Sequence, residues 1–438
     1  MTIVEEALGA STVPRSWEVR PLWAIARERK GNLNTGMKET NLLSLSFGNV
    51  IRKDIDATGG LLPVSFEGYQ IVNQGDLILR LTDLQNDKRS LRSGLCTEQG
   101  IITSAYLCLV PTGIAPRYFA YLMRAYDVAK VLYPLGGGLR QSLTFEDIRM
   151  LPILVPPVEE QRRIADFLDD QVARIDESIV LRRSQREINE ARYLDQLRRL
   201  THKPDGARWR VGYAFLSGSG TTPKSDRPEY FDGSTPWVVS GDLNDGVIES
   251  TEKTVTNEAL TDHSALKVYR PGALLVAMYG ATVGRTGLLS ISACVNQAVC
   301  VLQERGPVSA RFAQYWFIAR RGDILELASG GGQPNISQEV VRNLRISTGD
   351  LRWQRERVDE IDRLSAQRST LEEIEQAGVR LLEERKRAVI TAAVTGELDV
   401  TTARPIGVGK WVPNVGASVD SAVRDQVPAQ APSIGGIG

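Results

Sequence analysis

The sequence predicts an α+β protein made by tandem duplication, in which a mixed, mostly β domain followed by a long helix occurs twice. Three features predict this fold class: internal matches at a nearly constant separation, short apolar runs between glycine-rich turns, and one long charged amphipathic segment closing each half. We expect the two helices to pair as an antiparallel coiled coil with pseudo-two-fold symmetry. In chain order we expect a first domain at 1–157, a first helical region at 158–203, a second domain at 204–350, a second helical region at 351–400 and a disordered tail at 401–438.

The composition limits the class of protein. The chain has 438 residues, enough for about two to four domains, and its 53 Lys and Arg residues balance 53 Asp and Glu residues. Because the net charge is zero, nucleic-acid binding would have to come from local basic loops. The first residues lack the basic segment of a secretory signal, no uncharged stretch suits a membrane span, and the four cysteines fit neither a zinc site nor a disulfide framework. We therefore expect a cytoplasmic protein without membrane contact.

The repeat is clearest from the middle of each half onward. Gly94 matches Gly287 at a separation of 193 residues, and the same separation carries Leu109 onto Leu302, Phe119 onto Phe312 and Gln161 onto Gln354. Earlier the separation varies, with Trp17 on Trp209 at 192, Ser46 on Ser240 at 194 and Gly75 on Gly272 at 197. We therefore expect two copies of one domain that differ mainly in their loops.

Each half changes character once along the chain. Over 17–157 and 209–350, apolar runs alternate with glycine-rich turns as β-strands do, with one helix near 117–130 and another near 310–326. The segments 159–200 and 354–394 are charged, lack proline and have apolar residues at helical spacing. A 40-residue helix is about 60 Å long, and its apolar stripe needs a partner. The other long helix is the simplest partner; two independent helical hairpins, one capping each domain, are the alternative.

Catalytic motifs are absent from the sequence. No Gly-x-x-x-x-Gly-Lys-Ser/Thr loop occurs, and the only Pro-Pro pair, at 156–157, lacks the flanking Asn or Asp and aromatic residue that hold a flipped adenine. His202 and His263 stand alone, while Cys108 and Cys300 lie in strand-like runs as small apolar residues do. We expect no catalytic residue, metal or cofactor in this chain.

The loops in which the two halves disagree are candidates for DNA reading. Asn, Gln and Arg side chains can pair with base edges and Lys or Arg with phosphates, although surface loops drift in any duplication. In the first half the candidate residues are Ser46, Asn49, Thr82, Lys88, Arg89, Arg92 and Arg140. In the second half they are Thr222, Lys224, Ser240, Asp242, Tyr279, Thr282, Arg285, Gln333 and Asn335.

Several motifs resemble the specificity subunits of type I restriction-modification systems. The start of the first helical region, 156–168, resembles the Pro-Pro-Leu-x-Glu-Gln opening of the helical region in that family. Further similar segments are 220–223, 230–231, 236–238, 280–284, 296–297, 335–337 and 387–400, so that the resemblance covers most of residues 15–400. The second helical region departs from the pattern, because 351–354 lacks the Pro-Pro pair.

The resemblance implies two target-recognition domains that read the two parts of a split, asymmetric site in double-stranded DNA. It also implies helical regions that set the spacer and dock two methyltransferase subunits, through which restriction subunits join the complex. S-adenosylmethionine, ATP and Mg²⁺ would then belong to these partner subunits. The residues expected to contact the partners are Gln161, Arg162, Gln354 and Arg355. A stand-alone DNA-binding regulator and a scaffold of the same fold that reads no sequence are the alternatives.

Overall fold

The computed structural model describes residues 13–55, 63, 65–84, 91–135, 142–329 and 334–400. The chain forms two compact units, the first made of 1–176 and 383–438 and the second of 177–382. Each long helix therefore crosses from one unit into the other, so the compact units do not follow the linear domain order. The expected tail at 401–438 lies outside the described residues.

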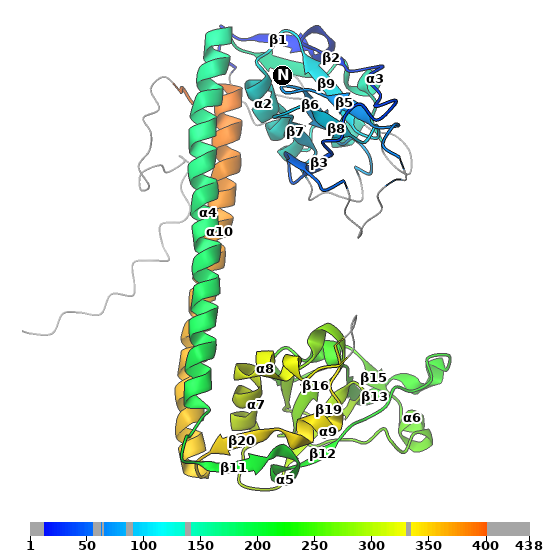
Figure 1. Cartoon of the computed structure of the whole chain (residues 1–438), viewed down its shortest axis with the longest axis vertical. Helices are drawn as coiled ribbons and strands as arrows, with labels where there is room; N and C mark the ends of the chain where they lie inside the picture. The colour runs from blue at the N-terminus through cyan, green and yellow to red at the C-terminus, as the bar shows by residue number, and fades with distance from the viewer. Residues whose placement is uncertain are drawn as a thin grey trace, which may run out of the picture. The chain divides into compact units, whose positions relative to one another are not determined.

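The first unit is built around a small antiparallel sheet covered by helix α2 (Figure 1). The central sheet has the strand order β2-β9-β6-β7, and the strand pairs β1-β10, β3-β4 and β5-β8 flank it. Along β6, Leu77 and Leu79 face the core shared with α2, whereas Ile78 faces a second cluster on the other side. Its elements are β1 (Glu18–Pro21), η1 (Leu22–Ala24), β2 (Ala26–Glu28), β3 (Leu43–Ser46), β4 (Asn49–Arg52), β5 (Gln70–Val72), β6 (Leu77–Leu79), β7 (Ser93–Leu95), β8 (Gly100–Ile102), β9 (Leu107–Pro111), α2 (Pro116–Val128), η2 (Tyr133–Leu135), α3 (Phe145–Ile148) and β10 (Pro152–Val155).

The second unit repeats this plan with a larger sheet. Its strand order is β12-β19-β16-β17-β14, with a second sheet β15-β13-β18 and the pair β11-β20 beside it. Both faces of β16 are buried, since Leu274 and Val276 pack toward α7 and Leu275 and Ala277 pack toward the second sheet. Its elements are β11 (Ala207–Arg210), α5 (Val211–Ala214), β12 (Phe215–Gly218), η3 (Pro228–Tyr230), β13 (Phe231–Val238), η4 (Ser240–Asp242), β14 (Val247–Ile248), β15 (Thr254–Val255), α6 (Asn257–Asp262), β16 (Leu274–Ala277), η5 (Gly280–Thr282), β17 (Thr286–Leu289), β18 (Cys294–Val295), β19 (Val299–Glu304), α7 (Ala310–Ala319), α8 (Arg321–Glu326), α9 (Gln338–Asn343) and β20 (Arg345–Thr348).

Strand register confirms the duplication in the centre of each unit. Leu77 pairs with Leu109 and Leu95, and in the second unit Leu274 pairs with Leu302 and Leu288. These pairs reproduce the separations of 197 and 193 residues expected from the sequence.

Two details of the sequence alignment are wrong. The Leu22 amide donates to the Leu151 carbonyl, and in the second unit the Val211 amide donates to the Leu344 carbonyl. Leu22 and Val211 are therefore equivalent, and the separation between the two copies in this segment is 189 residues. Trp17 and Trp209 are therefore not equivalent. Helices α2 and α7, which follow β9 and β19, have Ala115 and Ser309 as their N-caps. The separation between the two copies in these helices is therefore 194 residues. Both errors arise because similar residues one to three positions apart masked short insertions.

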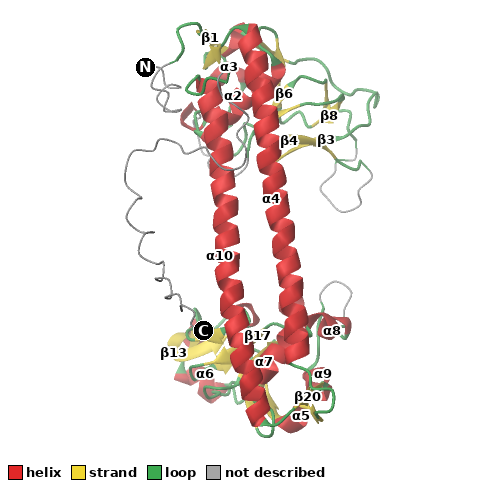
Figure 2. Ribbon diagram, turned by 90° about the vertical axis from the view of Figure 1, so that its left-hand side faces the viewer, coloured by secondary structure: helices red, strands yellow, loops and turns green. Residues whose placement is uncertain are grey.

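The two long helices, α4 (Val158–Leu200) and α10 (Leu351–Thr395), are continuous and pair in an antiparallel manner within each unit (Figure 2). In the first unit, Lys386 Nζ lies 2.7 Å from both carboxylate oxygens of Asp176. In the second unit, Asn189 donates to Glu375 over 2.8 Å, and the hydroxyls of Tyr193 and Ser365 are 2.8 Å apart. Residues later in α4 contact residues earlier in α10. This order confirms the expected antiparallel pairing and excludes two independent hairpins.

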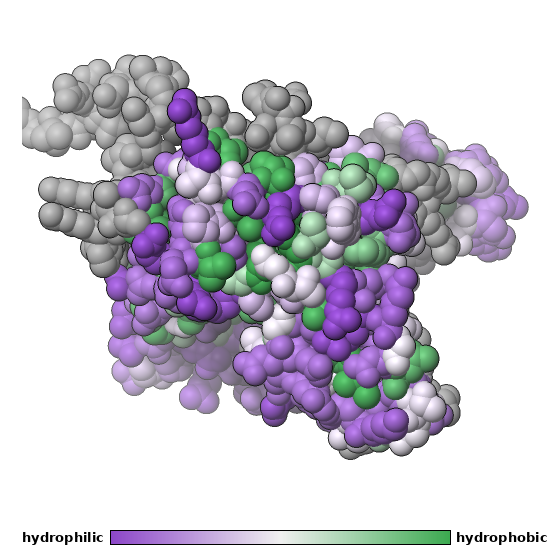
Figure 3. Space-filling view, turned by 90° about the horizontal axis from the view of Figure 1, so that it is seen from above, coloured by the Kyte–Doolittle hydropathy of each residue, from purple (hydrophilic) through white to green (hydrophobic). Residues whose placement is uncertain are grey.

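On the face shown in Figure 3, green apolar residues of the described part of the chain lie among purple polar ones. No helix within the described part of the chain is long and apolar enough to span a bilayer.

Candidate nucleic-acid interface

Five loops of the second unit meet at one end of its sheets. Strands β13 and β18 are parallel, so the loops that follow them leave from the same edge, and the Asn296 amide donates to the Val238 carbonyl over 3.0 Å. The loop after β12 joins them at Gly220, where an added Cβ would lie 1.7 Å from the carbonyl oxygen of Val295. Only glycine permits this approach, which brings Thr222 next to Gln297, to which it donates a 2.5 Å hydrogen bond.

The loop after β16 joins the loop before α9 at the same edge. Tyr279 forms an isolated antiparallel bridge with Asn335, and the Gly280 amide donates to the Pro334 carbonyl over 2.9 Å. The Met278 amide donates to the Ala298 carbonyl over 2.8 Å, which links this pair of loops to the one after β18. We call the result the second-unit loop surface, and its polar side chains are Thr222, Ser240, Tyr279, Thr282, Gln297 and Asn335.

The other predicted residues of this unit lie around that surface. Tyr279 is 47% exposed, Lys224 and Arg285 are exposed, and Arg285 directly follows the Tyr279 loop. The carboxylate of Asp242 accepts from the Val239 amide over 2.8 Å, so it helps to shape the turn η4. Gln333 lies outside the described residues.

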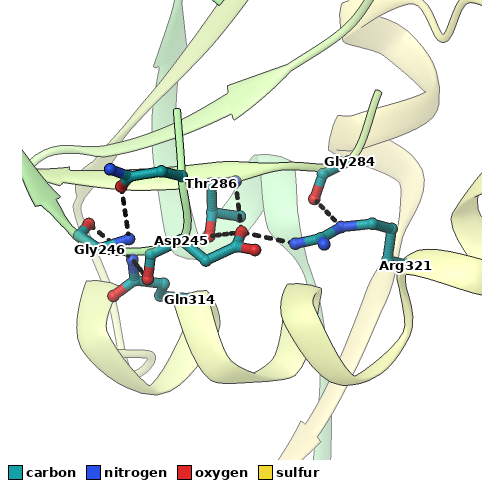
Figure 4. A network of polar contacts seen from close by, with 7 residues as sticks. Asp245, Gly246, Gly284, Thr286, Gln314 and Arg321 are labelled. Atoms are coloured by element: carbon teal, nitrogen blue, oxygen red, sulfur yellow. Dashed lines mark hydrogen bonds and ion pairs between the residues drawn. The ribbon is translucent and has the colours of Figure 1, made fainter. Parts of the chain in front are cut away.

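A partly buried polar network fixes two of these loops to the helices behind them (Figure 4). Asp245 Oδ1 accepts from Arg321 Nη2 at 2.5 Å, and from the amide and hydroxyl of Thr286 at 3.0 and 3.1 Å. Arg321 Nε also donates to the Gly284 carbonyl over 3.2 Å, and Gln314 Nε2 donates to the Asp245 carbonyl over 3.1 Å. The network therefore positions the ends of the loops that carry Ser240 and Tyr279.

Sequence reasoning missed Asp245, Gln314 and Arg321. The available signal was the six-residue stretch 241–246 that replaces a shorter turn in the first half. Nothing in the sequence pattern connects that stretch to helices seventy residues later.

The first unit offers a different and smaller set. Asn49 is exposed and Ser46 half-buried, and they pair across the tight turn between β3 and β4, whose tip Phe47 is 80% exposed. Arg124 of α2 donates to the Gly48 carbonyl and supports this turn from behind. Thr82 is half-buried, and Lys88, Arg89 and Arg140 lie outside the described residues.

Arg92 is a correction to the predicted set, because its side chain is fully buried. Its guanidinium donates to the carbonyls of Thr82 at 2.6 Å and Asp83 at 3.1 Å, and its amide donates to the Asp127 carboxylate over 2.5 Å. Arg92 therefore holds the loop that follows β6 and is not on the surface. Its counterpart Arg285 is exposed, so the two copies use this position differently.

Gln161 and Gln354 are a second correction, because both are buried. Gln354 accepts from the Ser309 amide over 2.9 Å and donates to the Pro307 carbonyl over 2.6 Å. Gln161 accepts from the Ala115 amide over 2.7 Å and donates to the Pro156 carbonyl over 2.8 Å. Each glutamine thus joins the first turn of a long helix to its own domain and is not available to a partner subunit.

The neighbouring arginines remain on the surface. Arg162 is exposed and pairs with Glu159 at 2.9 Å, and Arg355 is exposed. Their contact with partner subunits stays a prediction.

A duplicated polar contact that the sequence did not reveal strengthens the same joint. In the first unit, Asp169 of α4 accepts from Arg117 at 2.5 Å and from the Tyr121 hydroxyl at 2.7 Å. In the second unit, Asp362 of α10 accepts from Arg311 at 2.7 Å and from the Tyr315 hydroxyl. Each domain is therefore joined to its long helix at two positions, by the buried glutamine of the first turn and by this aspartate further along the helix.

The described residues contain no group of three or more His, Cys, Asp or Glu side chains that could hold a metal ion. All four cysteines are buried, and burial raises the pKa of Cys300 to about 12 and that of Cys294 to about 11. These thiols pack as apolar side chains.

The family model for the type I restriction modification DNA specificity domain matches residues 101–180 and 214–379, together more than half of the chain. The chain belongs to this family. The specificity subunit of the type I restriction enzyme EcoR124I/EcoR124II from Escherichia coli is 22% identical over 253 residues, which cover 54% of this chain and 61% of that subunit.

Solved structures of this family share the fold. One chain, from a study of complex assembly and conformational transition of the type I restriction-modification system, superposes with a TM-score of 0.70 at 19% identity, covering 88% of this chain and all of that one. The HsdS subunit from Thermoanaerobacter tengcongensis gives 0.50 at 18% identity, covering 89% and 99%. The type I specificity fold, with tandem domains and long helices, is therefore shared despite low identity.

Proposed function

We propose that this chain is the DNA-recognition subunit of a type I restriction-modification complex, and that each domain reads one half of a split, asymmetric site. The second-unit loop surface is the observation that carries the proposal. Its Tyr, Asn, Gln and Thr side chains can donate to and accept from base edges, while Arg285 and Lys224 beside it can neutralise phosphates.

The difference between the two units supports an asymmetric target. The central strands have the same register, yet the first unit presents the short Phe47 turn where the second presents the wider stretch 241–246. Two similar scaffolds with different loops suit two different half-sites.

The helices supply the proposed docking surface for two methyltransferase subunits. In the second unit, aliphatic side chains of both helices are exposed, which is costly unless a partner covers them. They are Val180, Leu181, Ile188, Leu371, Ile374 and Leu381. In this proposal S-adenosylmethionine, ATP and Mg²⁺ act in the partner subunits, restriction subunits join through the methyltransferase subunits, and the complex works in the cytoplasm.

Reconstitution tests the proposal. The purified chain alone should neither methylate nor cleave DNA. The chain mixed with its cognate methyltransferase subunit should methylate adenine within one split motif, and sequencing a methylated genome identifies that motif. Methyl transfer by the chain alone would refute the proposal that catalysis belongs to the partner subunits. A stand-alone regulator would be monodisperse and sequence-specific without a partner, and a non-reading scaffold would show no motif.

The helices should also set the spacer between the half-sites. Inserting four residues after Arg182 and four after Gly378, which face each other, lengthens both helices by about 6 Å and about one turn. At ~3.4 Å per base pair the spacer should grow by about two base pairs while the bases read in each half stay the same. An unchanged spacer in a fully active complex would show that the helices do not set it.

A further inference from the structure

The turn between β3 and β4 of the first unit carries an aromatic residue at its tip. Ser46 pairs with Asn49 across the two strands, which leaves only Phe47 and Gly48 between them. Phe47 has a φ angle of 46° and Gly48 one of 78°. Two positive φ angles in a two-residue loop define a type I′ turn, which favours Asn-Gly or Asp-Gly. A bulky side chain at positive φ is sterically unfavourable, so the turn itself does not account for the phenylalanine.

Packing does not account for this phenylalanine either. Phe47 is 80% exposed, more than any other large apolar side chain in the described part of the chain. The apolar contacts of the hairpin come from its other face, because an added Cβ on Gly94 would lie 2.6 Å from Leu45 Cδ1 and 3.2 Å from Val50 Cγ2. A strained backbone that presents an unburied aromatic ring is typical of a residue that contacts a ligand.

The tip is supported from behind. The guanidinium of Arg124, on α2, donates to the carbonyl of Gly48 and, over 3.5 Å, to that of Ser93 on β7. Gly48 is buried, and an added Cβ there would lie 2.5 Å from Arg124 Nη2. The backbone of the turn is therefore fixed before any ligand arrives, which lowers the entropy lost on binding.

The tip lies at the edge of its domain where the second unit has its loop surface. Leu42 forms a parallel bridge with Ile101, as Trp237 does with Cys294, and Cys294 matches Ile101 at the separation of 193 residues. Parallel strands end at the same edge. The turn after β3 therefore leaves from the edge that corresponds to the one carrying the Ser240 loop after β13.

The hairpin also carries polar side chains beside the ring. Since side chains alternate across a strand pair, Ser46 and Asn49 face away from the sheet that Leu45 and Val50 cover, and Asn49 is exposed. The major groove of DNA is about 12 Å wide and admits a two-stranded β-ribbon. Within this groove Asn can pair with adenine, and Phe can contact the methyl group of thymine.

We propose that the β3-β4 hairpin enters the major groove of the first half-site, where Phe47 contacts the methyl group of a thymine. The inference rests on the proposed function, which brings DNA to the loops of each domain. Asn49 is two residues further along the chain, roughly 7 Å, and a base pair rises ~3.4 Å. An adenine bound by Asn49 should therefore lie within about two base pairs of this thymine.

Deoxyuridine tests the contact, because it lacks only the methyl group of thymine. Each thymine of the mapped site is replaced in turn, and binding is measured for the chain in complex with its cognate methyltransferase subunit. One replacement, in the half-site whose base preference Asn49→Ala also changes, should weaken binding about fourfold, the effect of one buried methyl group. Phe47→Ala should bind the thymine duplex more weakly than wild type and should bind the thymine and uracil duplexes equally.

Two further variants separate binding from folding. Asn suits the first position of a type I′ turn, so Phe47→Asn should unfold at the same temperature as wild type or higher and still lose the thymine effect. Tyr213→Ala removes an aromatic side chain that is 70% exposed on α5, outside the loop surfaces, and should keep the fourfold effect.

A fourfold effect that persists in Phe47→Ala, or a wild-type complex that responds to no uracil in that half-site, would overturn the inference alone if the sequence preference is intact. Loss of methyltransferase binding in Phe47→Ala, with the thymine effect unchanged, would assign the tip to a protein contact and overturn it too. Equal binding of the wild-type complex to all sequences would refute the proposed function, and the inference with it.

Discussion

The ion pair between Asp245 and Arg321 should couple energetically, because both side chains are only 28% exposed and share one network with Thr286. Two charges about 4 Å apart attract by about 4 kcal/mol at an effective dielectric constant of 20, and desolvation offsets most of this. We therefore expect a coupling free energy of about 1 to 2 kcal/mol, more than the 0 to 1 kcal/mol of a solvent-exposed pair.

A double-mutant cycle measures that coupling. Asp245→Asn and Arg321→Gln should each lower the free energy of local opening around the Thr286 amide, measured by hydrogen exchange. The double variant should lower this free energy by about 1 to 2 kcal/mol less than the sum of the two single effects. The exposed helical pair Arg352 and Glu356 is the matched control and should show coupling below about 0.5 kcal/mol. Both network variants should also alter the preference for bases in the second half-site and leave the first unchanged. Additive single effects would refute the reasoning.

Other perturbations follow from the packing. Gln354→Ala should reduce the free energy of unfolding by about 2 to 4 kcal/mol, because it leaves a buried amide and carbonyl unpaired, while Arg355→Ala should stay within about 0.5 kcal/mol in the same urea titration. Gly287→Val should lower the midpoint of thermal unfolding, at a cost of about 1 to 3 kcal/mol, since its Cβ would lie 2.5 Å from Ile248 Cδ1; an unchanged midpoint would contradict this packing. The native chain should not react with a chromogenic disulfide reagent at pH 8, because burial raises the pKa of Cys300 to about 12. Unfolded thiols ionise near pH 8.5 and native ones do not, so the thiols' contribution to stability should fall as pH rises above about 8.5.

The fold could be predicted in large part because its signals are local or periodic. The repeat, the long helices and their antiparallel pairing follow from spacing along the chain, and the central strands keep the expected separation at Leu77 and Leu274. The predicted matching of residues between the two copies was wrong where similar residues nearby concealed short insertions, as at Trp17.

The candidate site was only partly predictable, because burial cannot be deduced from residue type alone. Arg92 and Arg285 occupy equivalent positions, yet one is buried under the Thr82 loop and the other is exposed. Gln161 was taken for a surface residue because it lies in a charged helix, but it faces inward toward the Ala115 amide. The pairing of Asp245 with Arg321 depends on tertiary contacts for which the sequence carries no periodic signal.

The core of the first unit includes Ile390, Ala393 and Val394 of α10, packed with Leu168 and Phe119. These residues leave the ribosome long after Asp176, the last residue of that unit's first segment. At ~5 to 20 residues per second, the delay during synthesis is about 10 to 45 s. During that time the nascent first domain exposes an unfilled apolar groove, so its folding is completed by the last helix to be made, and a chain that stops before Ile390 should need chaperones or aggregate.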